Sequence, residues 1–85
     1  MGITMTVPIR LATLHGSEEA HLLQAHGCVV AVLAYIPSEN GGDGSWWLEA
    51  GFGPWAQEGL VFPTVEAAET WVRDRLPAHW KPTGT

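Results

Sequence analysis

The residues with the strongest chemical character lie in SWWLEAGFGPWAQEG, positions 45–59. This stretch holds three tryptophans within ten positions and two glutamates. An indole face attracts cations, and a neighbouring carboxylate supplies a counterion. The segment therefore predicts a binding site for a flat cation or a partner's arginine, made by Trp47, Glu49, Trp55 and Glu58.

Zinc is the metal to consider, because His21, His26 and Cys28 carry imidazole and thiolate groups. On a helix the two histidines would lie about 140° apart, and Cys28 follows the expected helix end. His26 suits a helix C-terminus, where the dipole favours it. The spacing therefore predicts no metal site.

Three further motifs fail on their context. GFGPWA at 51–56 matches the dinucleotide pattern G-x-G-x-x-A but is not followed by a helix long enough for that fold. A calcium loop placed on 39–49 would put Ala50 where the bidentate glutamate belongs. Ser17 follows His15 closely but serves as a helix cap, and nothing specifies a catalytic triad. We predict no catalytic residue and no cofactor, and hence a protein that is not an enzyme.

Composition bounds the remaining classes. The 85 residues, 46% hydrophobic and 15% charged, predict one globular domain. Residues 1–72 carry eight acidic side chains against Arg10 alone, within a chain of net charge −5. A body with so little positive charge is not expected to bind nucleic acid. The single cysteine, the absence of a signal-like segment and an apolar run too short for a bilayer predict a cytoplasmic protein without a membrane span.

The first half of the chain predicts a strand, a helix and a strand. Apolar residues alternate over 3–11, which is typical of a strand with one buried face, and Pro8 favours a sheet edge. GSEEAHLLQAHG predicts a short helix over 17–26, capped by Ser17 and stopped by Gly27. Residues 28–36 are apolar on both alternations and rich in β-branched types, which indicates a central strand.

The second half predicts two strands and a closing helix. Strands are expected at 45–52 and around 60–62. TVEAAETWVRDRL predicts a helix capped by Thr64 and ended by Pro77. The expected fold class is α+β, a single two-layer domain over 1–77 in the order β-α-β-β-β-α. Its sheet is mixed or antiparallel, its helices pack mainly on one face, and 78–85 form a frayed tail.

Strand alternation separates the two adjacent tryptophans. Trp46 shares its phase with Leu48 and is expected in the core, whereas Trp47 shares its phase with Glu49 and is expected on the open face. Trp55 has two possible placements: outside the core beside Trp47, or folded back over the end of the core.

FPTVEAAETW, positions 62–71, resembles the strand-to-helix junction of the arm-type DNA-binding domains of phage tyrosine recombinases. Phe62, Pro63, Thr64, Ala68 and Trp71 carry the resemblance, which covers ten of the 85 positions. It implies a sheet that leads through a threonine cap into a helix. The lysines and arginines that such a domain needs on its sheet are absent here.

These features predict a small, acidic protein-interaction module that uses its tryptophan-bearing sheet face or turn, as an inhibitor or regulator of a basic partner. The alternative is a binder of an apolar or aromatic cation in a cleft lined by tryptophan and glutamate. We also expect a homodimer, formed through the open face or the edge that bears Pro8.

Overall fold

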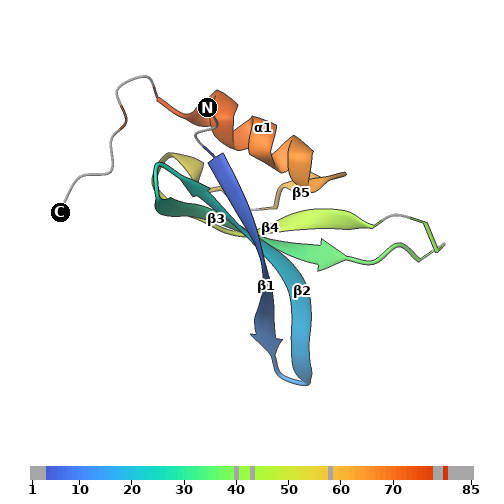
Figure 1. Ribbon diagram of the computed structural model, residues 1–85. Helices are drawn as coiled ribbons and strands as arrows, with labels where there is room; N and C mark the ends of the chain where they lie inside the picture. The colour runs from blue at the N-terminus through green and yellow to red at the C-terminus, as the bar shows by residue number, and fades with distance from the viewer. Residues whose placement is uncertain (1–3, 40, 43, 58, 78–79, 81–85) are drawn as a thin grey trace.

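The computed structural model describes residues 4–39, 41–42, 44–57, 59–77 and 80. Five antiparallel strands precede one helix: β1 (Thr4–Thr13), β2 (Gly16–Ala25), β3 (Cys28–Ile36), β4 (Ser45–Gly51), β5 (Val61–Phe62) and α1 (Val65–Arg75). A short 3-10 turn, η1 (Gly53–Trp55), lies between β4 and β5. The order of the strands in the sheet is their order in the chain, and α1 lies against one face of the sheet (Figure 1). The domain is therefore α+β with an antiparallel sheet.

The predicted helix over 17–26 is wrong, because this segment is β2 and the element order is β-β-β-β-β-α. In this strand the odd-numbered residues face one side of the sheet and the even-numbered residues face the other. β2 pairs with β1 on one side and with β3 on the other, and these ladders override local helix preference. The Ser17 hydroxyl oxygen accepts hydrogen bonds from the guanidinium of Arg10, at 3.0 and 3.2 Å, instead of capping a helix.

Gly27 has a different role from the predicted helix stop. Ala25 pairs with Cys28, so His26 and Gly27 form a two-residue hairpin loop. Both have positive φ, 52° for His26 and 80° for Gly27, as a type I′ turn requires. The same glycine that suits a helix end thus joins β2 to β3, and no β-α-β crossover is formed.

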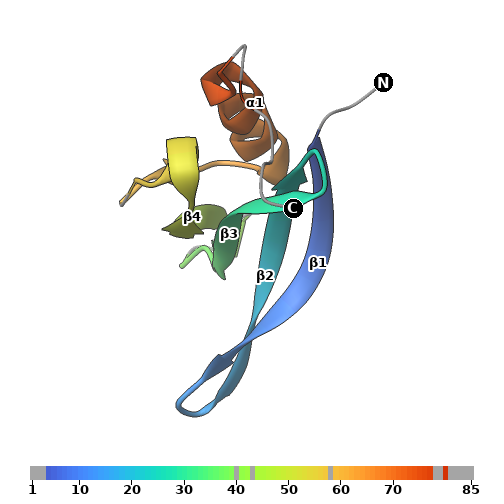
Figure 2. The ribbon, with the colours of Figure 1, turned by 90° about the vertical axis from the view of Figure 1, so that its left-hand side faces the viewer.

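The core lies between the sheet and α1. Its buried residues come from β2, β3, β4 and α1, with Trp55 from η1 and Phe62 from β5. From α1, Ala68 and Val72 are buried in it, whereas Trp46, which was expected in the core, is only partly buried and packs at its margin. Figure 2 shows α1 on one side of the sheet, with the β1–β2 turn at the end of the sheet away from the helix.

The junction into α1 follows the sequence prediction. The Thr64 side-chain oxygen accepts a hydrogen bond of 3.0 Å from the Ala67 backbone N–H, which makes Thr64 the N-cap. Phe62 is buried at the end of β5 and packs on Trp71 with ring centroids 5.6 Å apart. The sheet therefore leads through a threonine cap into the helix, as the local resemblance implied. The predicted tail at 78–85 lies outside the described residues apart from Trp80, which packs against the core with its ring centroid 5.3 Å from that of Trp55.

Candidate functional site

One apolar row crosses the sheet on the face opposite α1. The strand registers pair Ile9 with Ala20, Ala20 with Ala34, Ala34 with Trp47, and Trp47 with Val61. Directly paired residues on antiparallel strands point to the same face. All five strands thus contribute an apolar side chain to a single line, and we call the face that bears it the open face.

Burial confirms that this row is separate from the core. Ala20 and Ala34 have 0% and 4% exposure, yet neither belongs to the cluster packed under α1. These small residues lie between larger apolar neighbours on the same face. Further side chains of the open face are solvent-exposed, among them Met5, Val7 and Ile36. The open face therefore has two buried alanines at its centre and larger, exposed apolar side chains around them.

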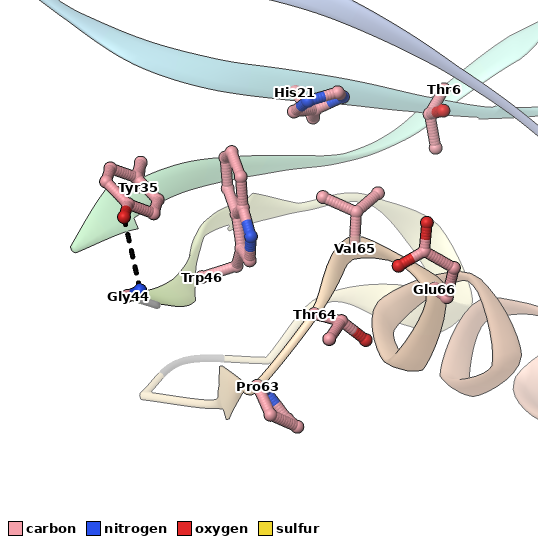
Figure 3. A pocket seen from close by; sticks show the side chains of 9 residues that line it. All are labelled: Thr6, His21, Tyr35, Gly44, Trp46, Pro63, Thr64, Val65 and Glu66. Carbon is pink, nitrogen blue, oxygen red and sulfur yellow. Dashed lines mark hydrogen bonds between the residues drawn. The ribbon is translucent and has the colours of Figure 1, made fainter. Parts of the chain in front are cut away.

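The orientation of β1 explains much of this surface. Its predicted alternation is present, but the apolar residues pair with the even-numbered residues of β2, which face away from the helix. The prediction that this face of β1 is buried is therefore wrong for the described chain: Met5 keeps 60% of its surface exposed. Thr6 lies on the helix side instead, beside Val65 and Glu66 (Figure 3). The alternation in the sequence shows that β1 has one apolar face, but it does not show on which side of the sheet α1 packs.

Trp47 and Glu49 form a hydrogen-bonded pair on the open face. The Trp47 indole N–H donates to a carboxylate oxygen of Glu49 at 2.7 Å. A register shift in the β3–β4 ladder between Val32 and Leu33 leaves Glu49 as the extra residue of β4. Trp47 is 38% exposed, in agreement with its predicted place on this face. The carboxylate holds the indole by its edge, so a negative charge lies beside an accessible aromatic ring.

The charges of the open face have one sign. Glu18 lies on this face because it pairs with Leu11, and Glu49 lies there because its carboxylate accepts the hydrogen bond from Trp47. Arg10 lies on the opposite side of β1 and is bound to Ser17. The other described cations, Arg73 and Arg75, are on α1. The open face therefore combines an apolar centre with uncompensated negative charge.

The structure separates Trp55 from Trp47. Trp55 is buried with 1% exposure, and its indole N–H donates to the Val72 carbonyl oxygen at 2.9 Å. Its backbone packs against Gly51 so closely that a Cβ there would clash with the Trp55 carbonyl. Of the two placements considered for Trp55, the one over the core is observed. The predicted cleft of two indoles around a carboxylate is not formed.

The fourth predicted site residue, Glu58, lies outside the described residues. A hollow of about 400 Å³ beside Glu49 is lined by Ala50, Gly51, Ala56 and Gln57. Sequence reasoning missed Ile9, Ala20, Ala34 and Val61 as parts of the surface around Trp47. The apolar alternation of the first strand marked Ile9, but Ala20, Ala34 and Val61 carry no such local signal and join the surface only when the strand register is known.

The described residues contain no group of three or more histidine, cysteine, aspartate or glutamate side chains placed to hold a metal ion. In the same part of the chain, no helix has the length and apolar character needed to cross a membrane. Comparison with family models, curated proteins and solved structures finds no match for this chain. The geometry of the open face therefore carries the functional argument.

Proposed function

We propose that this chain is a small, non-enzymatic protein-interaction module that binds an apolar and basic partner on its open face and thereby regulates that partner. The observation that carries the proposal is the apolar row from Ile9 to Val61, which crosses all five strands on the side away from α1. Exposed apolar side chains surround the two buried alanines of this row: Met5, Val7, Ile36, Trp47 and Val61. Exposed apolar patches mark association sites in soluble proteins, and tryptophan is a preferred anchor of binding energy in them.

Charge selects the kind of partner. The register places Glu18 on the open face, and the hydrogen bond to Trp47 places Glu49 there, whereas no described arginine lies on it. An arginine from a partner would meet the accessible face of Trp47 and the Glu49 carboxylate together, and both attract it. A second copy of the chain would bring like charges toward one another instead. The predicted homodimer is therefore the competing occupant of this surface.

A peptide pair tests the proposal. A peptide of alternating leucine and arginine and its leucine and glutamate counterpart are titrated into the protein, and the Trp47 indole N–H signal is followed by NMR. We expect only the arginine peptide to bind, with a Kd below about 1 mM, equivalent to about −4 kcal/mol. Added salt should weaken this binding, because opposite charges are screened.

Variants locate the binding. Trp47→Ala and Glu49→Gln should each reduce the affinity for the arginine peptide. Leu14→Ser is the matched control, because Leu14 is 92% exposed at the β1–β2 turn and lies away from the row. Equal binding of both peptides, no binding of either, or an equal loss in the Leu14 variant would contradict the proposal. If a cationic dye bound at Trp47 and neither peptide did, the result would support the alternative function, a binding site for a small molecule.

A further inference from the structure

A second concave site lies on the helix side of the sheet, away from the open face. It has a volume of about 360 Å³ and is formed where β1 to β4 meet the beginning of α1. Figure 3 shows Thr6 and His21 above it, Tyr35 and Trp46 at one side, and Val65 and Glu66 on the helix below. We call it the His21 pocket. Its volume is at the small end of the range typical of ligand sites.

Three rings form a wall of this pocket. His21 and Trp46 meet edge to face with centroids 4.9 Å apart and an interplanar angle of 84°. Trp46 also contacts Tyr35, with centroids 5.0 Å apart. Trp46 packs against the core, so its position is fixed by the fold. A flat aromatic ligand would find a stacking surface that is already ordered, which reduces the entropic cost of binding.

Two polar groups on this wall have unused hydrogen-bonding capacity. The Nδ1 atom of His21 is buried and has no hydrogen-bond partner among the described residues. Buried polar atoms are nearly always satisfied by protein, water or ligand, so this one calls for a partner. The Tyr35 hydroxyl oxygen accepts a 3.1 Å hydrogen bond from the Gly44 backbone N–H, which leaves its own proton to donate.

The charge at the rim decides between ligand classes. Glu66 carries the only carboxylate among the described residues that line the pocket, and Figure 3 shows this carboxylate directed toward the side that bears Thr6. None of the described residues that line the pocket is a lysine or an arginine. A ligand anion would meet this carboxylate without a cation to offset it, whereas a ligand cation would pair with it.

We propose that the His21 pocket binds a small aromatic cation, with its ring against Trp46 and its positive group at Glu66. This site is independent of the open face, and neither proposal requires the other. The aromatic wall supplies apolar contact, His21 and Tyr35 supply hydrogen-bonding groups, and Glu66 supplies the charge. The site differs from the predicted cleft at Trp47 in both its residues and its side of the sheet.

Benzamidine is the probe, with benzamide as its neutral analogue and benzoate as its anionic one. Each is titrated into the full chain while the Trp46 indole N–H and the His21 ring signals are followed by NMR. We expect saturable shifts at both residues with benzamidine, weaker binding of benzamide, and the weakest binding of benzoate. Trp47→Ala should leave the benzamidine shifts at Trp46 and His21 unchanged, which separates this site from the open face.

The decisive variant is Glu66→Gln, because Glu66 is exposed and its replacement is not expected to unfold the protein. It should weaken benzamidine binding about two- to fivefold, as expected for an exposed ion pair, and leave benzamide binding unchanged. Glu69→Gln, on the same helix but outside the pocket, is the matched control. The proposal would be overturned if benzamidine gave no saturable shifts at about 10 mM, a concentration well above a weak Kd of about 1 mM. It would also be overturned if Glu66→Gln and Glu69→Gln had equal effects, or if the shifts were confined to Trp47.

Discussion

The indole N–H of Trp55 donates a 2.9 Å hydrogen bond to the carbonyl oxygen of Val72, 17 residues later in the chain. Val72 lies in the last turn of α1, where carbonyl groups lack partners within the helix. The backbone N–H of Leu76 bonds to the Arg73 carbonyl and leaves that of Val72 to Trp55. The buried Trp55 side chain thus supplies a hydrogen-bond donor to the last turn of α1, the helix that packs over it.

This bond predicts the effect of Trp55→Phe. The phenyl ring keeps much of the apolar contact, but the Val72 carbonyl loses its partner in a buried place. We expect a loss of about 1–3 kcal/mol in the free energy of unfolding for the unsatisfied group, measured by urea denaturation. Trp47→Phe is the control and should change stability little. An unchanged midpoint for the Trp55 variant would show that the hydrogen bond does not stabilise the protein.

The three tryptophans of the 45–59 segment should differ in their truncation costs. Trp55→Ala empties a fully buried position and is expected to cost about 3–5 kcal/mol. Trp46→Ala should cost less, because Trp46 is only partly buried, and Trp47→Ala should cost least. Thermal unfolding of the three variants checks this order. If Trp47→Ala lowered the melting temperature as much as Trp55→Ala, Trp47 would be a core residue, which would contradict its place on the open face.

The hairpin loop between β2 and β3 gives a prediction for His26→Asn. The sign of its effect on stability depends on whether His26 lies in a type I′ turn or at the end of a helix. Asparagine tolerates positive φ better than histidine, and Asn-Gly is the preferred type I′ loop. His26→Asn should therefore raise the free energy of unfolding, by about 0.5–1 kcal/mol, the scale of other backbone-compatible substitutions. At the end of a helix the same change would bring no such gain. A destabilised variant would contradict the observed turn.

Self-association should occur at high micromolar concentration through the open face, because nothing described in the chain covers Trp47. Its salt dependence should be opposite to that of binding to a basic peptide. Salt screens the repulsion between Glu18 and Glu49 of two copies, so association should strengthen as ionic strength rises. Sedimentation velocity at two salt concentrations measures this. A dimer that salt dissociates would indicate attractive ion pairs between copies and a different interface.

Strand alternation was sufficient to place Trp46 and Trp47 on opposite faces, because it depends only on the local backbone. The segment at 17–26 was not predictable in the same way. Gly27 after His26 fits both a helix end and a type I′ loop, and Ser17 fits both a cap and a strand. The choice between them is made by pairing with β1 and β3, which are distant interactions that a local pattern does not contain.

The candidate site was predictable only in part for the same physical reason. Trp47 and Glu49 are two residues apart on one strand, so their proximity follows from the sequence. Trp55 is placed by Val72 and by the space above Gly51, neither of which its neighbours in sequence reveal. The row through Ala20 and Ala34 depends on the register of four hairpins. It therefore becomes visible only in the assembled sheet.

Because the strands lie in the sheet in chain order, each hairpin can form as soon as its second strand leaves the ribosome. The face under α1 is covered later, since Trp55, Ala68 and Val72 are synthesised after the first four strands. Until then the growing chain carries a sheet with two uncovered apolar faces. Chains that stop before Val72 should therefore be substrates for chaperones or proteases, whereas chains that include α1 bury one face of the sheet and leave the other exposed.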